Sequence, residues 1–294
     1  MKVVGIGGGH GLAATLKSAR RYADEVAAVV TVADDGGSSG RLTRELGIPP
    51  PGDIRNCLAA LSDERDLVAL YQHRFQSGEL TGHPAGNLII AALAEMTGDF
   101  ATAVERAGRL VGAHGRVHPA TTALVDLHAR VEGRVVRGQA AVGRASAPIQ
   151  AVYLDPPDPP AHAAAVEAIL GADQVILGPG SLFTSLIATL LVPGVGAAIR
   201  ETNASRIFVC NTRCQKGETE GMSAASHLEA ILAYAGPFSV DVVVVQRPEL
   251  PEDGVRVDLS EPSFSGVRVV AADLADPSGA HHPIRLADVL GRLP

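Results

Sequence analysis

The feature that most constrains the fold is VAAVVTVA (Val26–Ala33), an almost continuously apolar segment near the N-terminus. A strand buried on both faces has this pattern, and such strands belong to parallel sheets covered by helices. A shorter apolar run, Lys2–Ile6, precedes it and ends in glycines, and Leu12–Tyr22 between them carries a helical pattern. The chain therefore begins with strand, glycine loop, helix and strand, which predicts a doubly wound, mostly parallel α/β sheet.

The second half of the chain repeats this alternation. The elements predicted there are strands at Gln174–Gly178, Arg206–Asn211, Val240–Val245 and Val267–Ala272, and helices at Ala161–Leu170, Ser181–Leu191 and Ala224–Ala235. Two segments interrupt it. Residues 53–113 are mostly helical in pattern and predict a cap on one edge of the sheet, and residues 124–142 alternate around Glu132 and Gly133 as a β-hairpin does. We expect one Rossmann-like domain over residues 1–294.

Composition argues against several classes of protein. A net charge of -7, with 3% aromatic residues and no tryptophan, argues against a nucleic-acid partner. The apolar runs are shorter than the roughly 18 residues that a membrane span needs, and no signal peptide is recognised. The three cysteines, Cys57, Cys210 and Cys214, have the spacing of neither a disulfide framework nor a zinc motif. We expect a cytoplasmic protein without membrane insertion.

The loop GIGGGHGLA (Gly5–Ala13) links the first strand to the first helix. Its glycines let the backbone approach an anion, and N–H groups at a helix start can hold a phosphate. A tight turn that only packs helix on strand is the alternative, but it needs fewer glycines. The dinucleotide fingerprint G-x-G-x-x-G is broken at His10 and Leu12, which argues against NAD(P). His10 lies at the loop apex, facing either a ligand or solvent.

Two adjacent carboxylates, Asp34 and Asp35, are expected at the carboxyl end of the second strand. Doubly wound folds place a ribose-binding acid about 20 positions after the glycine loop. Neighbouring side chains point in opposite directions, so one acid can face the ligand while the other holds the next loop or a Mg²⁺ ion. The loop Gly36–Gly40 and Arg41 then offer amides, hydroxyls and a guanidinium to phosphate. The alternative is a flexible loop with a solvated acid pair.

Four further loops place polar side chains beside predicted helix starts or strand ends. They are PPPGDIRN (Pro49–Asn56), where Asp53 is a natural N-cap, GHPAGNL (Gly82–Leu88), GPGSLFTSL (Gly178–Leu186) and CNTRCQKGETEG (Cys210–Gly221). The loop Gly178–Leu186 is, after Gly5–Ala13, the second helix start that is suited to binding an anion. Helix capping or solvation is the alternative reading of these residues.

Together these loops predict a cleft for a polyanion. The residues expected to contact its ligand are Gly7, Gly8, Gly9, His10, Gly11, Asp34, Asp35, Gly36, Gly37, Ser38, Ser39, Arg41, Asp53, Arg55, Asn56, His83, Asn87, Gly178, Pro179, Gly180, Ser181, Thr184, Asn211, Gln215, Glu218 and Thr219. The chain contains no G-x-S-x-G, H-E-x-x-H or G-x-x-x-x-G-K-[ST] motif, so no catalytic residue or reaction is assigned.

The motifs GIGGGHGLA, DDGGSSGRL, PPGDIRN, GHPAGNL, GPGSLFTS and CNTRCQKGETEG resemble the YvcK family, the gluconeogenesis factors, over roughly Val3–Val245. That family is related to the CofD-type 2-phospho-L-lactate transferases. The resemblance implies a cytoplasmic bacterial protein that binds UDP-N-acetylglucosamine or a similar UDP-sugar. It further implies a regulator that links gluconeogenic growth to peptidoglycan precursor supply and cell shape. Cell-wall-precursor enzymes and a Ser/Thr kinase are the protein partners it implies, and a homodimer is left open.

The chain departs from the family pattern near the expected site. His10 stands where the family usually has threonine, and Arg213, Cys214 and Lys216 replace other residues of a family motif. The pair His281–His282 stands where the family has Arg-His. Because of these departures, the UDP-sugar that the chain prefers is left open. The alternative to a regulator is a Mg²⁺-dependent, CofD-like transferase.

Overall fold

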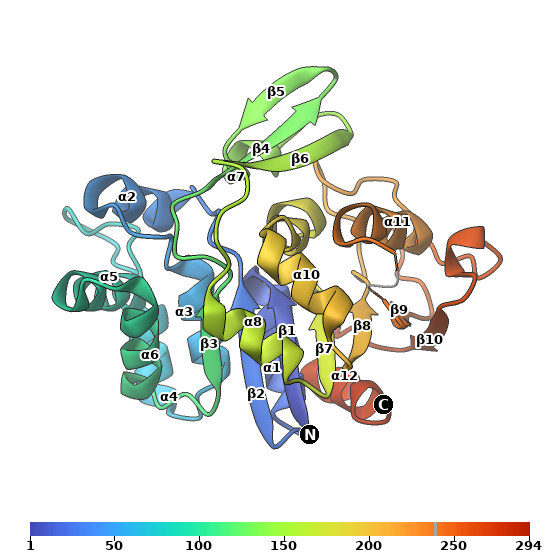
Figure 1. Ribbon diagram of the computed structural model, residues 1–294, viewed down its shortest axis with the longest axis horizontal. Helices are drawn as coiled ribbons and strands as arrows, with labels where there is room; N and C mark the ends of the chain where they lie inside the picture. Colours follow the sequence, from blue (N-terminus) through green and yellow to red (C-terminus); the bar gives the residue numbers. More distant parts are fainter. Residues whose placement is uncertain (238–239) are drawn as a thin grey trace.

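The predicted parallel strands form one seven-stranded sheet (Figure 1). The computed structural model describes residues 1–237 and 240–294. Across the sheet the order is β10 (Arg268–Ala272), β9 (Val242–Gln246), β8 (Ser205–Val209), β7 (Gln174–Leu177), β1 (Lys2–Gly7), β2 (Glu25–Val30) and β3 (Arg116–Pro119). Every neighbouring pair is parallel. The predicted doubly wound α/β class is thus confirmed.

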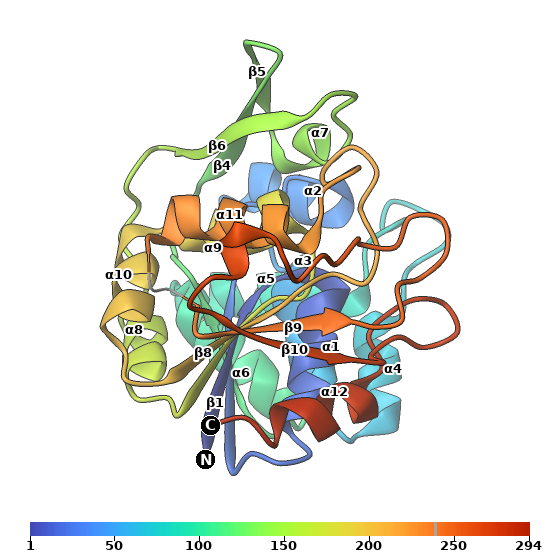
Figure 2. The same ribbon diagram turned by 90° about the vertical axis from the view of Figure 1, so that its right-hand side faces the viewer.

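Helices cover both faces of this sheet (Figure 2). One face carries α1 (Gly9–Ala19), α3 (Gly52–Ala60), α6 (Phe100–Leu110) and α12 (Pro283–Leu290), and the other carries α8 (Ala163–Leu170), α10 (Pro193–Glu201) and α11 (Ala224–Ala235). Neighbouring strand residues enter different cores, since Val3 packs in the first layer and Val4 in the second. Burial on both faces is the reason that the strand sequences are nearly continuous apolar runs.

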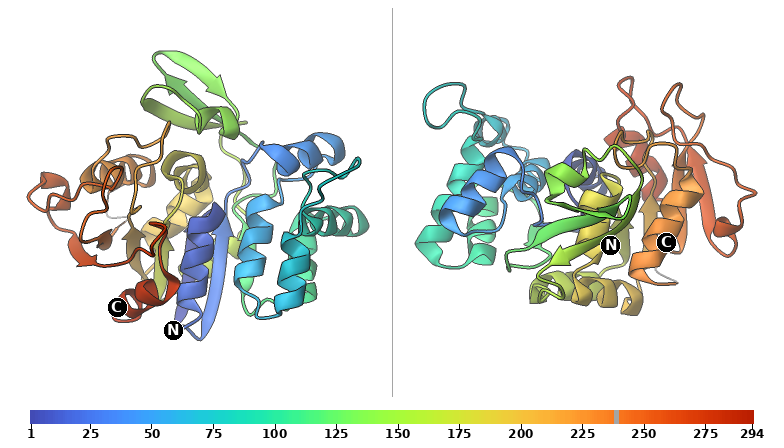
Figure 3. Two further views of the ribbon diagram at one scale, coloured as in Figure 1. Left: turned by 180° about the vertical axis from the view of Figure 1, so that it is seen from behind. Right: turned by 90° about the horizontal axis from the view of Figure 1, so that it is seen from above.

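The predicted helical cap lies beside the β3 edge of the sheet (Figures 1 and 3). It contains α3, α4 (Arg65–Gln72), α5 (Ala85–Thr97) and α6, with α2 (Gly37–Leu46) next to α5. The sequence predicts a loop at Gly36–Gly40, which is wrong because α2 begins at Gly37. Packing overrides the poor helix propensity of its glycines, since Leu42 is buried in the core.

A small antiparallel sheet stands above the carboxyl ends of the main strands (Figure 1). Its order is β5 (Arg134–Arg137), β4 (Asp126–Val131) and β6 (Ile149–Asp155), and β4 turns into β5 at Glu132–Gly133 as predicted. The hairpin ends at Arg137 rather than at residue 142, because α7 (Gln139–Val142) follows it. The sequence analysis did not predict the strand β6. It has no strong strand pattern of its own, and pairing with β4 is what mainly holds it.

Other boundaries also differ from the prediction. The strand β2 ends at Val30, before residues 31–33, and the short edge strand β3 was not predicted. The predicted helix 181–191 is a π-helical segment, η1 (Leu182–Ile187), followed by α9 (Ala188–Leu190). The helix α10 was missed because PGVG has poor helix propensity, which the proline at its first turn and buried Val195 and Ile199 outweigh. A short 3-10 turn, η2 (Pro262–Phe264), precedes β10.

No single helix in the described ranges is long and apolar enough to cross a membrane. One pair, Leu182–Leu190 with Pro193–Glu201, meets the length and composition criteria only together, and it is bent by 76°.

Candidate functional site

The strand order places a switch point between β1 and β7. From β1 the chain continues outward to β2 and β3, and it later returns to β7 and continues outward on the other side. Doubly wound sheets bind their ligands outside the carboxyl ends of the strands at such a point. Here those loops are the two glycine loops, Gly7–Gly11 and Gly178–Gly180. The switch point therefore coincides with the segments expected to bind an anion.

The two glycine loops touch each other, and neither has room for a larger residue at the contact. A Cβ atom on Gly11 would lie 2.3 Å from the carbonyl oxygen of Pro179, and one on Gly180 would lie 3.2 Å from that of Gly8. Asn211, just after β8, donates to the Gly180 carbonyl at 2.9 Å and accepts from its N–H at 3.0 Å. The crevice floor is therefore held in one conformation by the fold itself.

Two carboxyl groups of the chain already occupy the helix starts expected to hold phosphate. Asp53 accepts the N–H of Gly9 in the first turn of α1. Glu218 accepts the N–H of Thr184 at 2.9 Å in the first turn of η1. Glu218 is buried and Asp53 is half-buried, and desolvation raises the pKa of each. The strongest amide donors of the two loops are thus paired within the protein.

Asp53 was predicted to cap α3, and this is wrong. The helix α3 begins at Gly52 after Pro51, so Asp53 lies within its first turn and its carboxyl group points into the fold. A Cβ atom on Gly8 would lie 2.3 Å from Asp53 Oδ2, which shows how closely this carboxyl group covers the glycine loop. Burial and the negative charge of Asp34 raise the pKa of Asp53 to about 7.

Asp34 and Asp35 lie a few residues beyond the end of β2, not at the strand end itself, and their side chains serve different partners. Asp34 Oδ1 accepts the N–H of Gly36 at 2.9 Å, and burial raises the pKa of Asp34. Asp35 Oδ1 accepts the N–H of Ala140 at 2.7 Å, which fixes α7 and the small sheet above the crevice. One acid therefore remains near the other site residues, whereas its neighbour is structural.

A chain of hydrogen bonds joins three segments of the helical cap. Arg55 Nη1 donates to Asn87 Oδ1 at 3.0 Å, and Asn87 Nδ2 donates to Ser38 Oγ at 3.0 Å. Ser38 Oγ lies 2.8 Å from His83 Nδ1. All four side chains are buried. Asn87 is not the N-cap of α5, which is Pro84, and its amide joins the N-terminal turns of α2, α3 and α5 instead.

Arg55 belongs to this chain and Arg41 and Arg74 lie near it, and none of the three has a carboxylate within ion-pair distance in the part of the protein that the structure describes. The charges of Asp53 and Asp34 nevertheless act on Arg55 and raise its pKa. Arg41 Nη2 donates to the Thr81 carbonyl at 2.7 Å, and Arg74 donates to the Gly82 carbonyl. Burial, followed by the charge of Arg74, lowers the pKa of Arg55 to about 10. Arg74 was not expected at the site, because no motif surrounds it in the sequence.

A cavity of about 200 Å³ opens on the other side of the glycine loops. Its lining combines both glycine loops with the segment after β8 and the turn before α12: His10, Gly11, Ala14, Pro179, Gly180, Asn211, Thr212, Arg213, Gln215, Ala280 and His281. The departures from the family pattern at positions 10, 213 and 281 therefore converge on one cavity. It contains no acidic residue.

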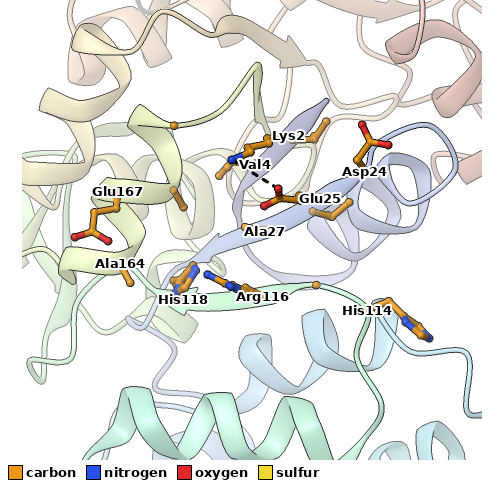
Figure 4. Close-up of a pocket in the computed structure, with 15 residues that line it drawn as sticks. Lys2, Val4, Asp24, Glu25, Ala27, His114, Arg116, His118, Ala164 and Glu167 are labelled. Carbon is orange, nitrogen blue, oxygen red and sulfur yellow. Dashed lines mark ion pairs between the residues drawn. The ribbon is translucent and has the colours of Figure 1, made fainter.

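A larger cavity of about 780 Å³ lies at the amino ends of β1 and β2, away from the switch point (Figure 4). Its polar side chains are surface residues of both signs, including Lys2, Glu25 and Arg116. Lys2 Nζ and Glu25 Oε1 form an exposed pair at 3.6 Å. Size alone would favour this cavity, but it has neither glycine loops nor converging helix starts, so we place the candidate site at the carboxyl edge.

The predicted site residues fall into three groups in the structure. The first group consists of residues that contact another member of the group or line the cavity of about 200 Å³: Gly7, Gly8, Gly9, His10, Gly11, Asp34, Ser38, Ser39, Asp53, Arg55, Asn56, His83, Asn87, Gly178, Pro179, Gly180, Ser181, Asn211 and Gln215. The second group is Gly37 and Arg41, which belong to α2, and Gly36, which is the N-cap of that helix. Asp35, Thr184, Glu218 and Thr219 are engaged in bonds that hold the surrounding loops.

The site contains few groups arranged for metal binding. No cluster of three or more His, Cys, Asp or Glu side chains that could hold a metal ion occurs within residues 1–237 and 240–294. Asp35 accepts the N–H of Ala140 in α7 and Asp34 accepts the N–H of Gly36, so each carboxylate of the acidic pair already has a backbone partner.

Comparisons with known proteins agree on one family. The profile of the family described as 2-phospho-L-lactate transferase CofD matches residues 3–280. The gluconeogenesis factor of Bacillus subtilis is 44% identical over 86% of this chain and 80% of its own length, and that of Halalkalibacterium halodurans is 44% identical over 83% and 76%. A crystal structure of a UPF0052 family member from Bacillus halodurans superposes with a TM-score of 0.94 at 37% identity, covering 98% of both chains.

Proposed function

The chain belongs to the CofD family and, within it, to the gluconeogenesis factors, and from this premise we propose that it is a regulator that binds a UDP-sugar such as UDP-N-acetylglucosamine. The observation that carries the proposal is the crevice at the switch point. Its floor consists of two glycine loops in contact, in which Gly9, Gly11 and Gly180 are partly exposed and carry no side chain of their own.

The groups around the crevice suit a ligand with both phosphates and rings. Three arginines without carboxylate partners stand on the side of the helical cap, and a cavity lined by amides, histidines and glycines lies on the other side. At about 200 Å³ the cavity is smaller than typical pockets for whole ligands, so it takes one part of a nucleotide-sugar. We propose that the protein acts in the cytoplasm and that, through this ligand, it regulates peptidoglycan precursor supply and cell shape.

A regulator rather than an enzyme is proposed because the side chains of Arg55, Asn87, Ser38 and His83 are hydrogen-bonded to one another. Ser38 and His83 are the nearest approach to a nucleophile and base, and both are buried under the cap. The alternative is a transferase like the protein for which the family profile is named. It is favoured by Asp34, which could ligate Mg²⁺ together with water and ligand phosphate oxygens. Magnesium would then neutralise charge on the phosphates.

Calorimetric titration tests the proposal. The purified protein is titrated with UDP-N-acetylglucosamine, UDP-glucose, GDP and NADPH, each with and without Mg²⁺. We expect selective binding of a UDP-sugar and no turnover on prolonged incubation. Binding of GDP or NADPH in place of UDP-sugars would refute the proposed ligand. Conversion of a UDP-sugar in the presence of an acceptor and Mg²⁺ would establish the transferase instead. Cell-wall-precursor enzymes and a Ser/Thr kinase are the proposed partners, to be sought by co-purification.

A further inference from the structure

A third cavity, of about 580 Å³, lies between α6, the edge strand β3 and the start of α8. It adjoins the cavity of about 780 Å³, and Gly115, Arg116, His118 and Ala164 line both. Figure 4 shows His118 of β3 beside Ala164 of α8. His162, the N-cap residue of α8, lines the cavity of about 580 Å³ as well. Two histidines that are 44 positions apart in the sequence therefore meet in one cavity.

The imidazole rings of His118 and His162 are neighbours. Their centroids are 6.0 Å apart and their planes are inclined by 37°. Both side chains are half-buried, and neither ring has a hydrogen-bond partner within residues 1–237 and 240–294. Although His162 occupies the N-cap position of α8, its side chain accepts no backbone N–H there. Water or a bound ion must therefore serve the ring nitrogens.

Backbone hydrogen bonds fix the spacing of the two histidines. The N–H of His162 donates to the carbonyl oxygen of Ala120 at 2.9 Å, and the N–H of Ala120 donates to that of Val30 at 2.8 Å. His118 lies two residues before Ala120, in the strand that pairs with β2. Both histidines are thus attached to the same edge of the main sheet, and a ligand between their rings would need little reordering of the chain.

Both imidazoles are neutral at pH 7. Burial, followed by the charge of His162, lowers the pKa of His118 to about 4. Burial also lowers the pKa of His162 from its ordinary value of 6.5. Neutral imidazole is the form that binds a metal ion, because a nitrogen without a proton carries the lone pair that the metal needs.

The carboxylates near the pair contribute negative charge. Glu105 acts on His118, and Asp99 and Glu167 act on His162, in each case in the direction that raises the pKa of the histidine. Arg116 opposes this effect at His118. No group of three possible metal ligands occurs among the described residues, so the two histidines would be the direct protein ligands.

The distance between the rings suits one shared ion. With Zn–N bonds of about 2.0–2.1 Å, the centroids of two imidazoles on one ion are about 5 Å apart in tetrahedral geometry and about 6.5 Å apart when they lie on opposite sides. The separation of 6.0 Å falls within this range. Imidazole nitrogens favour zinc, copper and nickel, whereas magnesium and calcium prefer oxygen ligands.

We propose that His118 and His162 together bind a divalent transition-metal ion such as Zn²⁺, with water completing its coordination. The ion links the edge strand β3 to the start of α8 and stabilises the folded chain, because it binds both elements only when they are folded together. The site lies apart from the switch point, and it does not depend on the proposed binding of a UDP-sugar.

Calorimetric titration of the untagged full chain with ZnCl₂, in the presence of excess MgCl₂, tests the proposal. We expect binding at this site, and magnesium should not displace the zinc. His118→Gln and His162→Gln keep a polar side chain of similar size, and each should weaken zinc binding by about tenfold or more, at least the cost of losing a group that only supports a ligand. Zinc should raise the midpoint of thermal unfolding of the wild type more than that of either variant.

Two controls address other places where zinc could bind. His114→Gln changes an exposed histidine that lines the neighbouring cavity, and Cys214→Ser changes a half-buried free thiol. Neither variant should alter zinc affinity, and thermal melts without metal check that all four variants are folded. Weakened binding confined to the variants at positions 118 and 162 would establish the site. A wild type that does not bind zinc, unchanged affinity in those two variants, or displacement of zinc by magnesium would overturn it.

Discussion

The two ends of the main sheet show that the size of a cavity and its chemistry are separate properties. The amino end has a cavity of about 780 Å³, bordered by exposed charges that pair with one another on the surface. The carboxyl end has a cavity of only about 200 Å³, but it adjoins two glycine loops, converging helix starts and buried ionisable side chains. Functional groups gather at the second end because every parallel strand delivers its loop there.

The difference is also energetic. At the carboxyl end, desolvation and the charge of Asp34 raise the pKa of Asp53 to about 7, and the contact between the backbones of the two glycine loops leaves no room for one added carbon atom at Gly11. At the amino end the acid–base pair of Lys2 and Glu25 is exposed, and such pairs contribute little to stability. Four sets of substitutions test this contrast.

The largest effect is expected from Asp53→Asn and concerns the pH dependence of stability. The folded protein holds the Asp53 proton up to about pH 7, whereas an unfolded aspartate releases it near pH 4. The free energy of unfolding should therefore fall as the pH rises between these values, by an amount on the order of 4 kcal/mol from this group. The variant has no ionisable group at position 53, so its free energy of unfolding should not decrease in this way. Urea denaturation from pH 4.5 to 8 measures the free energy of unfolding of both proteins. The same decrease with pH in the two proteins would show that the pKa of Asp53 is not raised in the folded state.

Gly11→Ala should lower the free energy of unfolding by about 3 kcal/mol, because the new Cβ would lie 2.3 Å from the backbone oxygen of Pro179. Gly9→Ala is the matched control in the same loop. Gly9 has open space around it and a φ of +63°, so alanine there costs only about 1 kcal/mol of left-handed strain. Chemical denaturation compares the two. Equal losses would show that the contact between the glycine loops is not tight.

Asn211→Ala removes both hydrogen bonds that hold the backbone of Gly180. We expect a loss of about 2 kcal/mol in the free energy of unfolding, since two backbone groups lose their partners. Binding of the UDP-sugar should weaken as well, because the loop is no longer fixed. The measurement is denaturation together with calorimetry. Unchanged ligand affinity would show that the second glycine loop does not contribute to the site.

The smallest effect is expected at the amino end. Lys2→Ala and Glu25→Gln each break an exposed ion pair, and each should change the free energy of unfolding by no more than about 0.5 kcal/mol. Neither variant should alter the affinity for UDP-sugar or inorganic diphosphate. Ligand binding that is weakened by either change would mean that the larger cavity is the functional one, and it would reverse the comparison between the two ends.

The architecture was largely predictable because it depends on patterns that are local in the sequence. Apolar runs that alternate with helices predicted the parallel sheet, and the Glu132–Gly133 turn predicted the hairpin. The missed elements β3, β6 and α10 lack a strong pattern of their own and are stabilised by their neighbours. The helix α2 was taken for a loop because its glycines oppose helix formation, and only the burial of its other side chains makes it helical.

The sequence by itself determined the doubly wound class and the loops that gather at its carboxyl edge, because strand order and apolar periodicity constrain both. The partners of the charged side chains were decided only by the tertiary structure. Asp53 pairs with the first turn of α1 rather than its own helix, Asp35 holds α7, and Arg74 joins Arg55 across the cap. The physical reason is that a buried charge is governed by whatever lies within a few ångströms, and those neighbours are distant in the sequence.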